Sequence, residues 1–194
     1  MPSKPGKRHP LLLYARLFAM LRWPAFLITV LCAGLWWFAF DIPLLSTNLA
    51  QAGLAIIALA CGALFLYALV GPMLSYVQCM SNHLRISTPL FRLAISYSRI
   101  NTTRPIQFLP GKLSFSQQRL VEPFIGSNAV LVDLTAYPIP ERWLRLWLTP
   151  FMFHPQARGL VLHVAEWMTV GRDIDSHRGE WKARRSDLAR HRAR

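Results

Sequence analysis

Two uninterrupted apolar runs near the N-terminus constrain this chain more than any other feature. They cover Trp23–Phe40 and Leu49–Val70, and neither contains a charged residue. A helix rises about 1.5 Å per residue, so the runs reach about 27 and 33 Å, close to a hydrocarbon core of about 30 Å. We therefore expect a transmembrane helical hairpin over residues 23–72, preceded by a basic interfacial segment over residues 1–22.

Basic residues are distributed unevenly around the two runs. Five precede the first run and 17 follow the second, whereas the loop Asp41–Asn48 holds one acid and no base. Because positive residues resist translocation, we expect both termini in the cytoplasm and the loop outside. This topology describes a multi-pass protein of the cell inner membrane.

Several small polar residues and prolines are expected to mark the helix boundaries. Pro24 suits a first helical turn, where its missing N–H costs least. Ser46, Thr47 and Asn48 are candidate caps of the second helix, which Gly71-Pro72 would end. A secretory signal peptide is disfavoured, because Arg16 and Arg22 interrupt the early apolar stretch.

Charge and cysteine content narrow the classes of partner. The net charge is +13, from 22 Lys and Arg against 9 Asp and Glu. Such an excess suits the positive-inside bias of a membrane protein, an anionic membrane surface or a nucleic acid, and the hairpin favours the first explanation. Cys32 and Cys61 lie within the apolar runs and Cys79 just beyond them, so we expect buried small side chains rather than disulfides.

After Pro72 the pattern changes to short runs of alternating polarity, which predicts strands. The pattern leaves Ser116–Ile125 open between a helical turn and a loop, and Glu141–Leu148 open between a helix and a strand. Extended chain is expected over Arg99–Phe108. The predicted strands are Tyr76–Met80, Leu84–Ser87, Leu93–Ser98, Ala129–Thr135 and Gly159–Val164.

The last part of the chain changes to a period near 3.6. Trp167, Val170, Ile174, His177 and Trp181 fall on one stripe of a helix. Short strands followed by one amphipathic helix predict an α+β domain, in which a bent antiparallel sheet or partly open barrel is capped by that helix.

One stretch resembles a known family. In residues 75–106, the residues Leu84, Ile86, Ile95, Tyr97 and Ile100 follow the apolar pattern of the opening hairpin of bacterial pleckstrin-homology-like domains. Such domains often follow one or two membrane helices. The resemblance covers residues 73–181, leaves a basic tail over residues 182–194, and implies a seven-stranded bent sheet with a C-terminal helix and no catalytic residues.

The sequence shows no constellation that would support catalysis or metal binding. No two of the six histidines have the spacing of metal ligands, and no Walker-type, GxGxxG or GxSxG motif occurs. His163 alternates with apolar neighbours and is expected to face solvent or a polar group. Asp173 and Asp175 diverge on a helix and are expected to be solvated. We therefore expect no enzyme activity, no cofactor and no metal.

Basic residues are the remaining candidates for a functional surface. They lie around the first hairpin and on the C-terminal helix, and the alternative is that they are only solvated. Nucleic acid is disfavoured as a partner, because residues 178–194 have no interleaved aromatic residue apart from Trp181. The candidates for binding an anionic surface are Arg85, Arg92, Arg99, Arg104, Arg178, Lys182, Arg184 and Arg185.

The sequence favours a non-catalytic module that is anchored in the lipid bilayer. Its cytoplasmic surface would serve a protein partner or anionic lipid headgroups. One alternative is an accessory subunit of a larger transport or secretion assembly, or a homo-oligomer, because small residues crowd the second apolar run. A membrane-bound enzyme is the weaker alternative, since only Thr29 and Gln51 place polar groups inside the runs.

Overall fold

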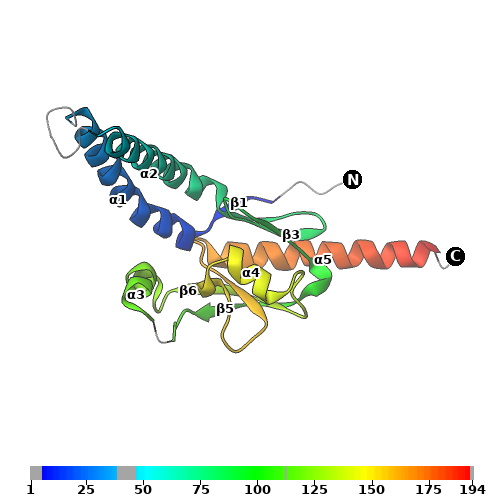
Figure 1. Cartoon of the computed structure of the whole chain (residues 1–194). Helices are drawn as coiled ribbons and strands as arrows, with labels where there is room; N and C mark the ends of the chain where they lie inside the picture. The colour runs from blue at the N-terminus through cyan, green and yellow to red at the C-terminus, as the bar shows by residue number, and fades with distance from the viewer. Residues whose placement is uncertain (1–5, 39–46, 112, 193–194) are drawn as a thin grey trace. The chain divides into compact units, whose positions relative to one another are not determined.

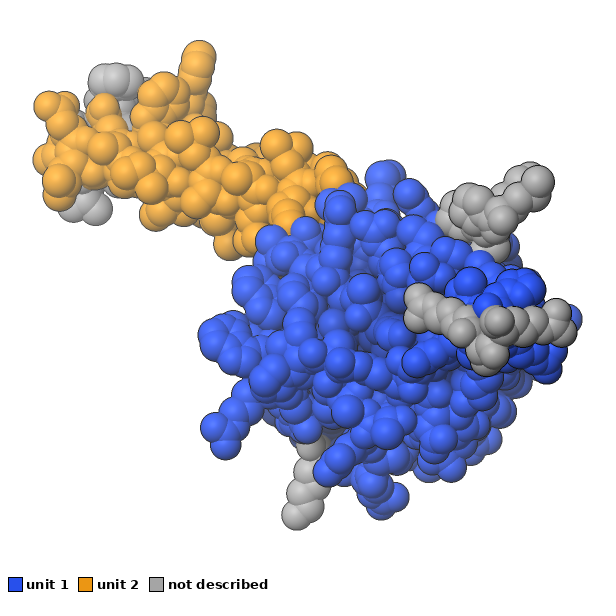
Figure 2. All heavy atoms as spheres, turned by 90° about the vertical axis from the view of Figure 1, so that its right-hand side faces the viewer, with its two compact units in different colours: residues 1–13, 73–194 blue, residues 14–72 orange. Residues whose placement is uncertain are grey.

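The structure, a computed structural model, describes residues 6–38, 47–111 and 113–192. They form two compact units, one of residues 14–72 and one of residues 1–13 and 73–194 (Figure 2). The first unit is helical, and the second contains the sheets and the remaining helices (Figure 1).

The helical unit consists of α1 (Leu12–Trp37) and α2 (Asn48–Leu74), which are long and apolar enough to cross a membrane. Only 17% and 6% of their most apolar segments are buried within the protein. A helix that is apolar on all sides is either buried in a core or surrounded by lipid. The low burial of these two helices sets them apart from the core helices of a soluble domain.

The helix boundaries differ from the predicted ones. α1 begins at Leu12 rather than Trp23. Arg16 and Arg22 interrupt the run of apolar residues from which the start was predicted, but arginine is a good helix former, so the helix includes both. Pro24 therefore lies inside α1 rather than in its first turn. The predicted end at Phe40 and most of the following loop, residues 41–46, lie outside the described residues.

The second helix continues past its predicted stop. Pro72 lies inside α2, which ends at Leu74. At its start, the Thr47 hydroxyl accepts a hydrogen bond from the Ala50 N–H at 3.3 Å, as expected of a cap. A Cβ atom at Gly71 would lie 2.6 Å from the ring of Phe18, so a larger residue there would displace that ring.

The first sheet is antiparallel, with strand order β1-β2-β3-β4. Three of its strands match predicted ones, whereas β1 comes from the segment expected to lie in the membrane interface. β1 has only three residues, too few to show an alternating pattern. Its partner β2 lies after both helices in the sequence, so no local signal predicts the pairing. The strands are β1 (Arg8–Pro10), β2 (Tyr76–Cys79), β3 (His83–Ser87) and β4 (Arg92–Ser96).

Each apolar helix is joined to this sheet by a single residue. Leu11 separates β1 from α1, and Ser75 separates α2 from β2. The Leu11 N–H donates to the Ser75 carbonyl at 3.0 Å, so the two connecting residues are bonded to each other. The Leu12 N–H donates to the His163 carbonyl at 2.9 Å, which satisfies one free donor of the first turn of α1.

The second sheet has the order β5-β6-β7, also antiparallel. Its strands are β5 (Ile100–Gln107), β6 (Asn128–Leu134) and β7 (Gly159–Leu162). The two segments whose secondary structure the sequence left undecided form the helices α3 (Phe115–Val121) and α4 (Glu141–Trp147). Within the described residues, the seven strands form two sheets that do not close into a barrel. The expected bent sheet is thus divided after β4.

The C-terminal helix α5 (Trp167–Arg192) contributes the predicted stripe to the core. Val170 and Ile174 are fully buried, while Trp167 and Trp181 are half-buried at its ends. Beyond the predicted end at Trp181, the chain remains helical through Arg192 and projects past the sheets (Figure 1). The Ala, Leu and Arg residues of residues 182–192 favour this continuation of the helix.

We predict that Ile174→Ala destabilises the sheet-containing unit by about 2–5 kcal/mol, because it leaves a cavity beside the sheets. Met168→Ala on the exposed side of the same helix should cost less than about 0.5 kcal/mol. Denaturant unfolding of the full chain in micelles, followed by near-ultraviolet circular dichroism, measures both. Equal midpoints for the two variants would show that the stripe is not part of the core.

Candidate functional site

One face of the first sheet is basic. Residues whose side chains point inward are buried, among them Val77 and Ile86 at 0% and 1% exposure. Because side chains alternate along a strand, Arg8, Arg85 and Arg92 lie on the opposite, outer face. We call these three residues the basic face.

The strand register places the three arginines in adjacent rows. Arg8 and Arg85 flank Gln78 in one row, and Arg92 pairs with Ser87 in the next. Diagonal neighbours on a sheet lie about 7–8 Å apart, so Arg85 and Arg92 can contact one extended anionic group. The Arg8 guanidinium also lies 4.8 Å from the centre of the Tyr76 ring.

Within the described residues, none of the three arginines of this face has an ion-pair partner. None of the four strands contains Asp or Glu, and the first acid after Asp41 is Glu122. Arg8 and Arg92 are exposed and Arg85 is half-buried. The face therefore combines an uncompensated positive charge with the side-chain exposure that contact with an anion requires.

Two other candidates of the first hairpin region have partners: Arg104 lies on β5 of the second sheet, and Arg99 ends the short 3-10 helix (Tyr97–Arg99) just before it. The Arg99 guanidinium donates to the Tyr137 carbonyl at 3.0 Å. Arg104 lies 3.2 Å from a carboxylate oxygen of Asp133, measured from Nε. The structure thus separates these two arginines from Arg85 and Arg92, which sequence order alone does not do.

The candidates on α5 lie elsewhere again. The Arg184 guanidinium donates to the Ser81 carbonyl in the β2–β3 turn at 2.5 Å, and Arg185 lies over the Trp181 ring at 5.3 Å. Arg178 is half-buried, while Lys182 is exposed. The β2–β3 turn is at the end of the sheet opposite the helix connections, so these residues do not join the basic face.

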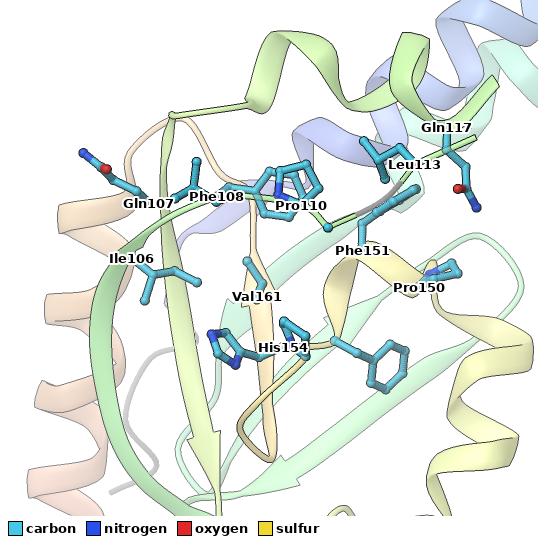
Figure 3. Close-up of a pocket in the computed structure, with 14 residues that line it drawn as sticks. Ile106, Gln107, Phe108, Pro110, Leu113, Gln117, Pro150, Phe151, His154 and Val161 are labelled. Atoms are coloured by element: carbon cyan, nitrogen blue, oxygen red, sulfur yellow. The ribbon is translucent and has the colours of Figure 1, made fainter. Parts of the chain in front are cut away.

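The second sheet borders a hollow of about 290 Å³ at the end of β5 (Figure 3). Apolar side chains form most of its lining, including Phe108, Phe151 and Val161, and Gln107, Gln117 and His154 are polar. The His154 Nδ1 accepts hydrogen bonds from two backbone N–H groups, at 3.0 and 3.2 Å. The described lining residues include no carboxylate, thiol or amine.

His163 is buried, contrary to the expectation that it faces solvent. Its exposure is 2%, and its ring lies edge-on to Phe108 and Phe124 at centroid distances of 4.4 and 5.5 Å. Within the described residues, neither ring nitrogen has a hydrogen-bond partner. Burial lowers the pKa of His163 to about 4. His163 follows the last residue of β7. Beyond the end of a strand, the alternation of side chains no longer predicts whether a residue is buried or exposed.

A second titratable cluster lies between the first sheet and α5. The buried His9 ring nitrogen Nε2 is 3.4 Å from the Asp173 carboxylate, so Asp173 is paired rather than only solvated as expected. Burial, with a contribution from Asp173, raises the pKa of the Cys79 thiol to about 12. A thiol protonated at neutral pH is a poor nucleophile. Within the described residues, no group of three or more His, Cys, Asp or Glu could hold a metal ion.

Comparisons with protein-family models, with curated proteins and with solved structures find no match to this chain.

We predict that His163 makes the fold sensitive to acid. The unfolded side chain binds a proton with a pKa near 6.5, whereas the folded one stays neutral to about pH 4. Its contribution to stability is therefore complete above about pH 6.5 and is lost as pH falls from there towards 4. Acid unfolding of the full chain in micelles should show this loss.

His163→Phe keeps a planar ring and should remove that part of the pH dependence. His163→Leu provides a second test if Phe does not fit between the two rings. His191→Gln, an exposed substitution on α5, should leave the pH profile unchanged. Identical acid profiles for wild type and both His163 variants would contradict the prediction.

Proposed function

We propose that this protein is a membrane-anchored, non-catalytic module. In this proposal α1 and α2 span the inner membrane, and the sheet-containing unit presents the basic face to anionic lipid headgroups or to an acidic protein partner. The observation that carries the proposal is the direct continuation of both apolar helices, through one residue each, into the sheet that bears this face.

The topology follows from charge. No basic residue occurs between Trp23 and Pro72, whereas 17 follow. Bases close to the end of a membrane helix resist translocation, and they occur before Trp23 and soon after Pro72, at Arg85 and Arg92, so both termini would stay in the cytoplasm. The short loop between the helices would lie on the other side.

The connections limit how far the sheet can lie from the lipid surface. Tyr76 is two residues from the end of α2, which is about 7 Å of extended chain. A Debye length of about 8 Å at physiological salt leaves charges at that distance able to attract an anionic leaflet. Each such base contributes about 1 kcal/mol of attraction.

The order of strands followed by a C-terminal helix supports a pleckstrin-homology-like identity for residues 73–181. The division into two sheets weakens it, because that family implies one bent sheet. The function proposed above does not depend on this identity.

An accessory subunit of a larger membrane assembly is the second candidate. Small residues on α2 support it, since Gly62 lies close to α1, with a Cβ position 3.6 Å from the Thr29 methyl group. Large exposed side chains on the same helix, such as Ile56 and Leu59, are available to a partner helix. The enzyme alternative is weakened, because the Thr29 hydroxyl donates to the Ala25 carbonyl of its own helix.

The topology predicts a labelling pattern for single introduced cysteines. A membrane-impermeant maleimide added to intact cells should label Thr47→Cys from outside. Ser186→Cys, on α5, should be labelled only after the membrane is permeabilised. The unmodified chain measures background from its three native cysteines. Labelling of Ser186→Cys in intact cells would contradict the proposed topology.

The basic face predicts selective retention of anionic lipid. Arg8→Gln, Arg85→Gln and Arg92→Gln combined should weaken binding of phosphatidylglycerol by at least about tenfold, given about 1 kcal/mol for each charge. Native mass spectrometry of the full chain in mild detergent measures the retained lipid, with phosphatidylcholine as reference. The loss should shrink as salt rises.

A triple variant on α5 is the matched control. Lys182→Gln, Arg185→Gln and Arg190→Gln remove the same charge from exposed positions at the far end of the sheet. This variant should retain lipid as the wild type does. A larger loss from the control than from the basic face would assign the attraction to the tail instead.

A further inference from the structure

A patch of large apolar side chains is exposed on α4 and the β3–β4 turn. Leu90 in the turn is 71% exposed, and on α4 the exposures are 61% for Trp143, 69% for Leu146 and 41% for Trp147. We call these four residues the apolar patch. The Phe91 ring stacks on Trp147, with centroids 5.8 Å apart, and so joins the turn to the helix.

The helix α4 is apolar on two sides. Leu144 and the following Leu148 are buried, at 0% and 2% exposure, and they hold the helix on the domain. Trp143, Leu146 and Trp147 have the spacing i, i+3, i+4 and form a second apolar side, which is exposed. A seven-residue helix that keeps two tryptophans and a leucine partly in water is unusual for a soluble surface.

Topology places the turn at a defined end of the first sheet. Pro10, Tyr76, Ser87 and Arg92 form one row across the four strands. Pro10 and Tyr76 are the strand residues next to the helix connections, so the β3–β4 turn extends from this same end. The β2–β3 turn, which Arg184 contacts, lies at the other end.

We propose that the apolar patch inserts into the interface of the membrane that α1 and α2 cross, which rests on the proposed function. Leu90, Trp143 and Leu146 enter the boundary between headgroups and acyl chains. Tryptophan favours this depth because its ring is apolar and its N–H can remain hydrated.

The charges around the patch match such a surface. Arg92 and Arg142 are exposed and, within the described residues, have no ion-pair partner, so they can reach lipid phosphates while their stems lie along the patch. The nearby acid Glu141 is paired with Arg145, with oxygen and nitrogen 2.7 Å apart. The patch is therefore apolar at its centre and positive at its rim.

Lipid fits this patch better than a protein partner because of its position. A docking site for a soluble partner could lie anywhere on the domain. This patch instead adjoins the end of the sheet where two membrane-length helices attach, within reach of the headgroups. The exposed leucine on α5, Leu188 at 65%, lies on the part of the helix beyond Arg184 and serves as a control.

The test uses the full chain reconstituted in vesicles of phosphatidylcholine and phosphatidylglycerol. Leu90→Cys, Leu146→Cys and Leu188→Cys each receive an environment-sensitive fluorophore, and unmodified chain corrects for native cysteines. All three positions are exposed, so the label does not disturb the core. Brominated lipids then report contact with acyl chains, and iodide reports contact with water.

We expect brominated lipid to quench the labels at Leu90→Cys and Leu146→Cys several times more than the label at Leu188→Cys. Iodide should give the reverse order. Equal lipid quenching at all three positions would overturn the proposal. Protection of the patch labels from both quenchers would also overturn it, because protein rather than lipid would then cover the patch.

The failure of this inference is distinguishable from failure of the proposed function. The maleimide pattern at Thr47→Cys and Ser186→Cys reports whether the helices span the membrane, whatever the patch contacts. A correct topology with an unquenched patch removes only the inference. An incorrect topology removes the proposed function itself.

Discussion

The rest of this structure depends on the bonding between two connecting residues. The Leu11 N–H donates to the Ser75 carbonyl, and each residue joins an apolar helix to one of two neighbouring strands. Backbone groups at a helix end need partners, and here Ser75 and His163, which flank strands β2 and β7, supply them. The hydrogen bond between Leu11 and Ser75 marks the end of the first sheet that is connected to the helices. The other surfaces of the domain are placed by how far along the sheet they lie from that end.

The two ends and two faces of the first sheet distinguish basic residues that are equivalent in the sequence. Arg85 and Arg92 remain on an outer face without acids, whereas Arg104 is neutralised by Asp133 and Arg184 is bonded to the far turn. A count of positive charge predicts attraction to an anionic surface. Only the register of the strands shows which charges can act together at one place.

Periodicity predicts much of this fold. The strands β2, β3, β4, β6 and β7, and the stripe of α5, are found because alternation and a 3.6-residue period report burial directly. β1 has three residues and pairs across the whole hairpin, so no local signal identifies it. His163 follows the last residue of β7, and its cover comes from Phe108 and Phe124, which are distant in sequence. The pattern of Glu141–Leu148 is ambiguous because its leucines and tryptophans form two apolar sides of one short helix, one buried and one exposed.

The basic face links stability to its proposed ligand. Arg8, Arg85 and Arg92 lie in adjacent rows without an acid in any of the four strands, so their mutual repulsion opposes folding of the sheet. An anionic leaflet that binds the folded face relieves this repulsion and stabilises the folded state by mass action. The repulsion weakens as salt rises, and so does the attraction to lipid, because both are screened by the same ions. Under the proposed function, such a domain would therefore be most stable at an anionic membrane surface.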